Sequence, residues 1–281
     1  MGVSPGALPH KVKIKGNGVT GINAKGNQIT NINVAKMSSL RTLDVSDNLL
    51  GGERAVFNRE LEMLNVDNNE ITALDLSGHN SLNTLYANNN QISEINVEGC
   101  TALSAVYVRG NMLESFSLSL LMRLGYMDCS DNLIGALDLS NATELGYLDC
   151  SNNNLSSLDL SNYSGYYLDC SHNNLESVDL GNDGGYHDVR GRFIQLFNLC
   201  NNKLTALDLS GLDRLRDVDI SDNDLSADEL NAMFESLHDK APLIGSMKII
   251  HINGNPGTDD CNVDIAERKG WSVIFGNGVS F

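Results

Sequence analysis

The sequence predicts a right-handed solenoid built mostly of short β-strands, with strands on both faces and a helical cap at the C-terminal end. Three observations lead to this prediction. A motif with fixed leucine and asparagine positions returns about every 21 residues. Within each copy apolar and polar residues alternate, as in a strand with one buried side. A clear helical pattern occurs only near the C-terminus, after Ser226.

The repeated motif reads L-x-x-L-x-C-x-x-N-x-L in the block LGYLDCSNNNL, at Leu145–Leu155. The same frame, with Val, Ala, Ile or again Cys at the Cys position, holds in six more blocks: Leu40–Leu50, Leu61–Ile71, Leu82–Ile92, Leu103–Leu113, Leu124–Ile134 and Leu215–Leu225. Its anchoring asparagines are Asn27, Asn48, Asn69, Asn90, Asn111, Asn132, Asn153, Asn173, Asn202, Asn223 and Asn255. Such a regular series predicts stacked units that share one continuous core.

These motifs resemble the leucine-rich repeat family over roughly residues 12–257. The second half of each unit, as in LSSLDLSN at Leu155–Asn162, is itself L-x-x-L-D-L, so the unit contains two similar halves. In this it is similar to the short 21-residue bacterial class, which occurs mostly in surface proteins of Gram-negative gut-type bacteria. Family convention calls such folds α/β. Because 21 residues leave little space for a convex helix, we expect a mostly β form.

Each unit is expected to form one turn of a coil, with the apolar members of L-x-L pointing inward. The anchoring Asn then turns its amide inward at the corner, where it satisfies backbone groups that would otherwise be buried unpaired. Cys129, Cys150 and Cys170 recur at one inward position. We expect them to be free buried thiols, because Cys behaves as a small hydrophobic residue.

The expected organisation is a disordered segment at 1–11, a leucine-rich repeat solenoid at 12–225, and a last repeat with a C-terminal cap at 226–281. An insertion at 181–192 is glycine-rich and predicts a mobile surface loop.

The C-terminal cap contains two expected helices. Ser226 and Glu229 form a capping-box pattern. Apolar residues follow at helical spacing, and Pro242 is expected to stop this helix. A strand within 247–255, a short helix over about 262–269 and a closing strand with Trp271 complete the cap.

Charge and composition exclude several partners. The chain has 19 Lys and Arg against 36 Asp and Glu, a formal net charge of −17, which disfavours nucleic acid and anionic membrane surfaces. No apolar run approaches the roughly 20 residues of a membrane helix. The resemblance implies an extracellular or outer cell-surface location with the leader missing. A cytoplasmic location stays open.

Outward positions of the strands bring tyrosines and aspartates together. Stacked strands lie about 4.8 Å apart, so Tyr126, Tyr147 and Tyr167 are expected to form a continuous row. Asp128, Asp149 and Asp169 are expected to run beside it. Tyr86 and Tyr107 would extend the patch on the adjacent column, and Arg109 would add one cation. Tyrosine is enriched in interfaces, but such rows also stabilise sheets by stacking.

The aspartates allow two interpretations. Carboxylates at about 5 Å repel by roughly 0.8 kcal/mol per pair in water. A second column repeats the problem on the opposite face: Asp138, Asp159 and Asp179, with Asp75 and Asp208 beyond. A bound calcium ion would relieve the repulsion. Local bonds to the serines two residues later are the alternative.

The sequence contains none of the common catalytic motifs. There is no G-x-S-x-G elbow, no P-loop and no H-E-x-x-H. Of the six histidines only His251 lies in an outward column, near Asp217 and Asp219. A lone surface histidine is more often solvated than catalytic, so we expect no enzyme, no catalytic residue and no metal ligand set.

The preferred hypothesis is a non-enzymatic module that binds a protein or glycan through the strand face that carries tyrosine and aspartate. The alternative is a structural or adhesive envelope protein whose acidic columns bind cations. We expect a monomer without cofactors. The expected contact residues are Tyr86, Tyr107, Arg109, Tyr126, Asp128, Tyr147, Asp149, Tyr167 and Asp169.

Overall fold

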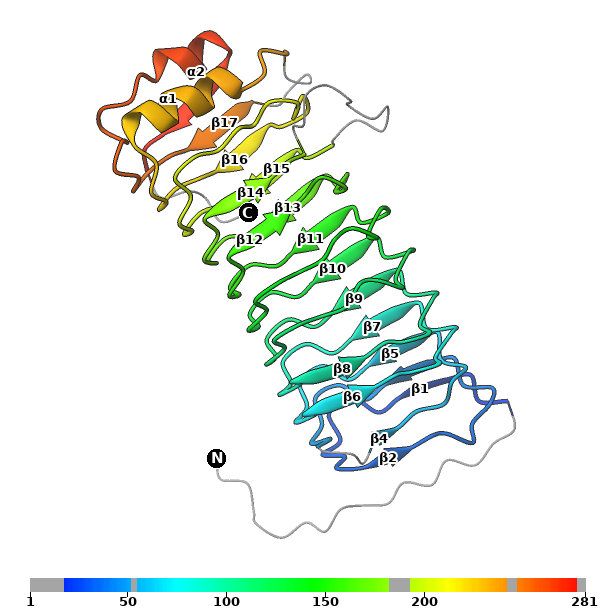
Figure 1. The fold of residues 1–281 in the computed structure, drawn as a ribbon. Helices are drawn as coiled ribbons and strands as arrows, with labels where there is room; N and C mark the ends of the chain where they lie inside the picture. The colour runs from blue at the N-terminus through cyan, green and yellow to red at the C-terminus, as the bar shows by residue number, and fades with distance from the viewer. Residues whose placement is uncertain (1–17, 52–54, 182–192, 242–246, 277–281) are drawn as a thin grey trace, which may run out of the picture. The chain divides into compact units, whose positions relative to one another are not determined.

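The computed structural model describes residues 18–51, 55–181, 193–241 and 247–276 (Figure 1). The chain divides into two compact units, Met1–Leu113 and Glu114–Phe281. Each is a stack of coils in which one short strand per coil joins a parallel sheet, so the predicted mostly β solenoid is confirmed. The predictions for 1–11 and for 182–192 lie outside the described residues. The boundaries at 12–225 and 226–281 stay predictions.

The first unit has one main sheet and two small rear sheets. The strands of its main sheet, in order, are β1 (Gly21–Asn23), β3 (Thr42–Asp44), β5 (Met63–Asn65), β7 (Thr84–Tyr86) and β9 (Ala105–Tyr107). The rear pairs are β2 (Ile32–Asn33) with β4 (Ala55–Val56), and β6 (Ala73–Asp75) with β8 (Glu94–Asn96). All these pairs are parallel and in register from coil to coil, as a fixed repeat requires.

The second unit repeats this plan. Its main sheet contains β10 (Tyr126–Asp128), β11 (Tyr147–Asp149), β13 (Tyr167–Asp169), β15 (Leu196–Asn198), β16 (Asp217–Asp219), β17 (Lys248–His251) and β18 (Trp271–Ile274). One rear pair joins β12 (Ser157–Asp159) to β14 (Ser177–Asp179). The corresponding segments at 136–138 and 206–208 form no ladder, although Leu137 and Leu207 are buried. Strands therefore occur on both faces, but only in part of the rear face.

The core is made by the inward positions that the alternation predicts. The central residues of the main strands, such as Leu64, Leu85 and Leu148, have no exposed surface. Cys129, Cys150 and Cys170 are buried free thiols in the same stack. Burial raises the pKa of all three thiols, which keeps them protonated and unreactive.

The anchoring asparagines satisfy buried backbone groups, as predicted. The amide nitrogen of Asn153 donates to the carbonyls of Cys150 at 3.1 Å and of Cys129, in the preceding coil, at 3.0 Å. Its carbonyl oxygen accepts from the backbone N–H of Ile134 at 2.9 Å. The same pattern repeats at other anchors, so each Asn bonds two coils together.

The residue before each anchoring Asn turns the chain in a left-handed conformation. Asn152 has φ 52° and Asp131 has φ 54°, and Gly110 occupies the same corner with φ 67°. Asn, Asp and Gly tolerate this conformation better than other residues. The corner therefore explains why Asn, Asp or Gly precedes almost every described anchor. Asn173 is different, because His172 occupies its corner with φ 52°.

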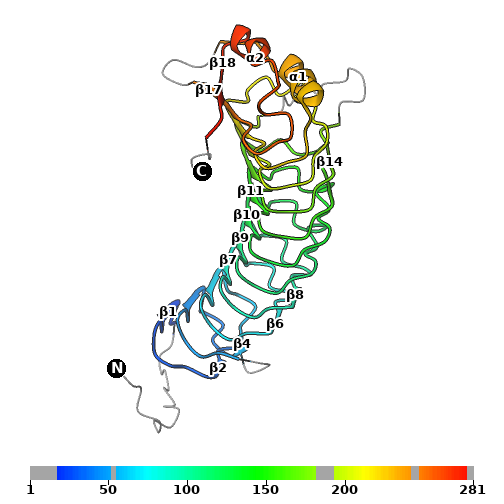
Figure 2. The same ribbon diagram turned by 90° about the vertical axis from the view of Figure 1, so that its left-hand side faces the viewer.

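The first helix of the cap begins where the sequence predicts and ends earlier than predicted. Helix α1 (Ala227–Ser236) begins at Ser226, and both bonds of the capping box are present. It ends at Ser236, because Leu237 is extended, so Pro242 does not stop it. Helix α2 (Asp264–Arg268) lies beside α1 at the end of the second unit (Figure 2).

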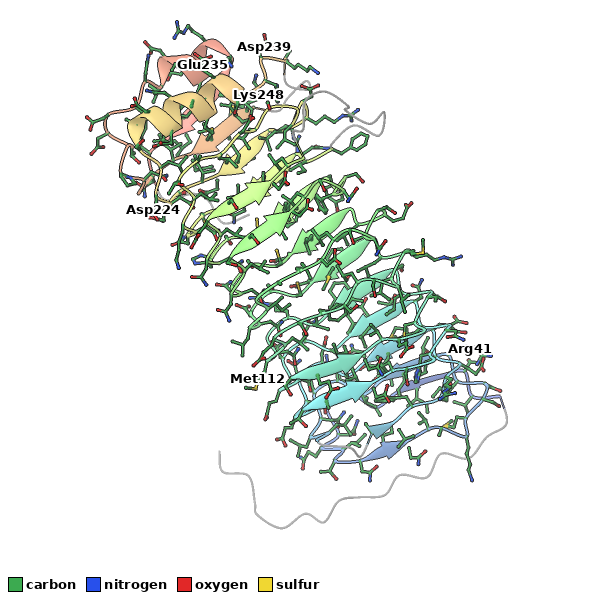
Figure 3. The ribbon with its side chains drawn as sticks, viewed as in Figure 1. Arg41, Met112, Asp224, Glu235, Asp239 and Lys248 are labelled. Carbon is green, nitrogen blue, oxygen red and sulfur yellow. The ribbon has the colours of Figure 1, made fainter. Side chains whose placement is uncertain are left out.

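Lys248 lies in β17 beside the helices of the cap and is buried (Figure 3). Its ammonium donates to the carbonyls of His238, Lys240 and Lys269, beyond the ends of α1 and α2. The Lys269 carbonyl belongs to the C-cap of α2, whereas His238 and Lys240 follow the last residue of α1, whose terminal carbonyls at Glu235 and Leu237 accept from the Lys269 ammonium. Among the described residues, no helix has the length and apolar character needed to cross a membrane.

Candidate functional site

The tyrosine row, Tyr126, Tyr147 and Tyr167, forms as predicted on the main sheet of the second unit. The strand register places the three residues opposite one another. The ring centroids of Tyr126 and Tyr147 are 4.2 Å apart, with 5° between the ring planes. The centroids of Tyr147 and Tyr167 are also 4.2 Å apart, with 2° between the planes. Burial raises the pKa of the Tyr147 hydroxyl, and that of the Tyr167 hydroxyl to about 12, so both stay protonated at neutral pH.

Tyr163 supports the row from beneath. It is buried, and its hydroxyl donates to the backbone carbonyl of Tyr167. A side chain at Gly165 would collide with the Tyr163 ring and with the carbonyl of Gly146. Glycine at this position therefore allows Tyr163 to reach the strand that carries Tyr167.

Tyr166 is a further tyrosine beside the row, and the sequence analysis missed it. It is 51% exposed, and its ring lies over Gly146, 3.6 Å from where a Cβ atom would stand. The signal was present in the sequence: Gly125 and Gly146 precede the first two tyrosines of the row, whereas Tyr166 precedes the third.

Tyr86, Tyr107 and Arg109 belong to the first unit. Tyr86 and Tyr107 stack on each other with ring centroids 4.7 Å apart and planes at 13°. The backbone N–H of Arg109 donates to the side chain of Asn88 at 2.9 Å, and its side chain is exposed. The expected contact residues are thus divided between the two units, and the extension of the patch by Tyr86 and Tyr107 stays a prediction.

The acid column, Asp128, Asp149 and Asp169, runs in register beside the tyrosine row. One oxygen of each carboxylate accepts two bonds from the serine two residues later. For Asp149 these come from the Ser151 backbone N–H at 3.0 Å and its hydroxyl at 2.7 Å. The local bonding that the sequence allowed is therefore present on this face.

Asp149 lies at the centre of the column, and its surroundings disfavour the ionised form of its carboxyl group. Burial, with smaller contributions from Asp169 and Asp128, raises its pKa to about 6, against the bonds from Ser151. The second oxygen of Asp169 accepts from the Asn198 side chain at 3.0 Å. Perturbed carboxyls of this kind concentrate at functional sites.

The rear acid column, Asp138, Asp159 and Asp179, has different electrostatics. Backbone N–H groups donate to Asp138 at 2.9 Å and to Asp159 at 2.8 Å. Hydrogen bonds from the following serines lower the pKa of both carboxyls. In the part of the chain that the structure describes, no group of three or more His, Cys, Asp or Glu is arranged to hold a metal ion.

His251 lies near Asp217, as its outward position predicted. The His251 Nε2 and Asp217 Oδ1 atoms are 3.7 Å apart, and their side chains are 7% and 26% exposed. Both the Asp217 Oδ1 and the His251 Nδ1 are buried without a hydrogen-bond partner. Burial raises the pKa of Asp217, with Asp219 adding to the shift and His251 opposing it. No nucleophile accompanies this pair in the contacts of the described residues.

Comparison with known proteins identifies the fold. No family model and no curated protein matches the chain. A leucine-rich repeat protein of Leptospira interrogans matches with TM-score 0.67 and 22% identity, over 78% of this chain and 58% of that one. YopM of Yersinia enterocolitica matches with TM-score 0.67 and 20% identity, over 86% and 48%. This chain thus spans less than two thirds of either protein.

A third match has similar length. It is a chain in the octameric complex of Latrophilin 3, Unc5D and the leucine-rich repeats of FLRT2. Its TM-score is 0.71 at 19% identity, over 95% of this chain and 86% of that one. At these identities the matches establish the leucine-rich repeat fold.

Proposed function

We propose that this chain is a non-enzymatic module that binds a protein partner through the main-strand face of its second unit. The observation that carries the proposal is the stacked tyrosine row beside the acid column. Three large aromatic side chains are held in fixed positions by strand register, so little side-chain entropy is lost on binding. Tyr86, Tyr107 and Arg109 are proposed as a separate contact group in the first unit.

The fold supports a binding role. Repeat solenoids present one extended sheet surface, and a structure with this fold occurs in the octameric complex with FLRT2. No motif or residue cluster in the described structure supports catalysis, and we propose that the module functions as a monomer without a cofactor. Its resemblance to bacterial surface repeats supports an extracellular or outer-surface location.

A glycan partner is less well supported by the geometry. Sugars bind aromatic residues mainly through open ring faces. The rings of the tyrosine row cover one another at 4.2 Å. A protein partner, which can use ring edges, hydroxyls and carboxylates together, fits this surface better.

The test uses a random-peptide display library selected on the intact protein. We expect selected peptides to lose at least tenfold in affinity for the double variant Tyr126→Ala/Tyr147→Ala, because aromatic anchors carry about 2 kcal/mol or more each. Fluorescence anisotropy with the synthesised peptides gives the affinities.

The matched control is Leu120→Ala/Met122→Ala, which removes two exposed apolar side chains of the same unit away from the main strands. It should leave the affinities unchanged. If the tyrosine variant keeps a native circular dichroism spectrum and loses less than tenfold, the binding site lies elsewhere.

A further inference from the structure

The main-strand face of the second unit carries a column of mostly acidic residues. One outward column runs in register through Asp128, Asp149, Asp169, Asn198, Asp219 and His251. None of the three-residue strands from β10 to β16 contains Lys or Arg. The surface thus carries a row of carboxylates without a cation between them in these strands.

The ring faces of the tyrosine row are already occupied. Near-parallel planes with ring centroids 4.2 Å apart leave Tyr147 with a neighbour on each face, and Tyr147 covers one face of Tyr126 and one face of Tyr167. A cation–π contact needs an open face, so the row presents mainly its edges and hydroxyls. Such edges pack well against the apolar stems of Lys and Arg, whose charged ends extend further.

The acid column has carboxylate oxygens that can accept further hydrogen bonds. In Asp128 and Asp149, Oδ1 is bonded to the following serine. No residue of the described chain donates to the Oδ2 of either one. An incoming cation can therefore bond to Oδ2 without breaking the internal bonds.

Unpartnered polar atoms at the end of the same face are independent evidence of a missing ligand. The Asp217 Oδ1 and the His251 Nδ1 are buried without a hydrogen-bond partner, although the His251 Nε2 lies 3.7 Å from the Asp217 Oδ1, and the His251 side chain is only 7% exposed. Leaving a buried acceptor unpaired costs about 1–3 kcal/mol. Arg216 precedes Asp217 in the chain, and its Nε is buried without a partner too, so it does not satisfy the carboxylate through that atom.

We propose that this face binds an extended, cationic segment of a partner protein, which lies across strands β10–β16 with Arg or Lys side chains on the free carboxylate oxygens. This inference rests on the proposed function, and it names the partner's chemistry. The apolar stems of the basic side chains pack on the tyrosine edges. Their charged groups bond to Asp128 and Asp149, and a further one approaches Asp217.

The probe is a synthetic peptide that alternates arginine and threonine. Strands about 4.8 Å apart make the face from β10 to β17 about 24 Å long, and an extended chain rises about 3.3 Å per residue, so about eight residues span it. Citrulline in place of arginine gives a peptide of nearly the same shape without the charge. Fluorescence anisotropy on the full chain measures both peptides.

The decisive comparison uses two double variants with the same change in charge. We expect Asp128→Asn/Asp149→Asn to lose at least tenfold in affinity for the arginine peptide. The control, Asp138→Asn/Asp159→Asn, changes two acids of the rear column and should lose less than twofold. Asn keeps the size of Asp, and thermal melts check that every variant folds. We also expect Asp217→Asn alone to lose more than threefold.

A pH series adds a second readout. Because burial raises the pKa of Asp149 to about 6, this carboxylate loses its charge as the pH falls below that value. Arginine does not titrate in this range. Affinity should therefore drop between pH 7.5 and pH 5.5 in the wild type, and the drop should be smaller in Asp149→Asn.

Several outcomes would overturn the proposal of a cationic partner. Equal losses in the two double variants would show attraction by net charge alone, and equal affinity for the citrulline peptide would exclude the charge contact. Binding of a chito-oligosaccharide that depends on Asp128 and Asp149, without peptide binding, would assign the face to glycans. If display-selected peptides depend on Tyr126 and Tyr147 but are not basic, the binding face stands and only its cationic specificity fails.

Discussion

Asparagine and aspartate have three distinct roles in each coil, and their surroundings decide which one. The anchoring Asn153 is buried and bonds two coils through its amide. Asn152, one residue earlier, makes the left-handed corner. Asp149 lies on the strand face, where its Oδ1 accepts hydrogen bonds from Ser151. The amide suits the buried anchor because it both donates and accepts without charge.

Asp149 should destabilise the folded chain at neutral pH. Its folded pKa of about 6 lies above the value of about 3.9 in an unfolded chain. Between these values the folded state binds more protons, so stability falls as the pH rises through the window. We expect Asp149→Asn to raise the free energy of unfolding at pH 7.5 by about 1–3 kcal/mol. The gain should shrink as the pH falls to 4, measured by urea denaturation.

Asp138→Asn is the control for this experiment. Its carboxyl has the same aspartate–serine arrangement, but bonds from Ser140 lower its pKa, so removing the charge should bring no gain. A gain of similar size in both variants would mean that net charge, and not the burial of Asp149, destabilises the chain.

At the scale of elements, the ends of the cap helices depend on a residue that belongs to neither helix. Helix α1 begins with a capping box that is local in sequence. The carbonyls of His238 and Lys269, just beyond α1 and α2, instead receive a charged donor from Lys248 in β17. The indole N–H of Trp271 donates to the same His238 carbonyl at 2.9 Å, which adds β18 to the network.

Lys248→Met should loosen the cap, because it keeps the apolar stem and removes three charge-assisted hydrogen bonds. We expect a loss of about 2 kcal/mol, since bonds from charged donors contribute about 1.5–3 kcal/mol each and the buried charge itself costs energy. Hydrogen exchange should become faster in α1 and α2. Lys203→Met, at an exposed lysine, is the matched control. Unchanged exchange in both helices would refute this role for Lys248.

At the scale of the whole molecule, a formal net charge of −17 is distributed over both faces of the coils. Local hydrogen bonds to serine satisfy one oxygen of the acids on each face, which offsets part of the repulsion. The stacked design therefore tolerates columns of like charge. Main-chain register places these acids side by side.

The melting temperature should not respond specifically to calcium. A site filled at 100 times its dissociation constant would add about 2.7 kcal/mol of stability. We expect melts in calcium chloride and in sodium chloride of equal ionic strength to agree within about 1 °C, because salt screens both alike. A calcium-specific rise that chelator reverses, and that Asp138→Asn/Asp159→Asn removes, would instead support the cation-binding alternative.

The sequence alone determined the fold and the direction of most side chains. A fixed period places equivalent residues in adjacent coils, and the alternation of the strand decides which of them point outward. The tyrosine row, the acid column and the anchoring asparagines followed from this. The capping box at Ser226 was equally local, and so was the start of α1. These features depend on a few neighbouring residues or on an exact repeat, which a sequence shows directly.

Only the tertiary structure decided the features that depend on distance and burial. It divided the chain into two units, one of which contains Tyr86 and Tyr107 and the other the tyrosine row. It placed Tyr166 over Gly146, and Lys248 beyond the ends of two helices. Asp149 and Asp138 share one sequence motif, yet burial raises the pKa of one and hydrogen bonds lower that of the other. Desolvation depends on everything packed around a carboxylate, and no local pattern contains that information.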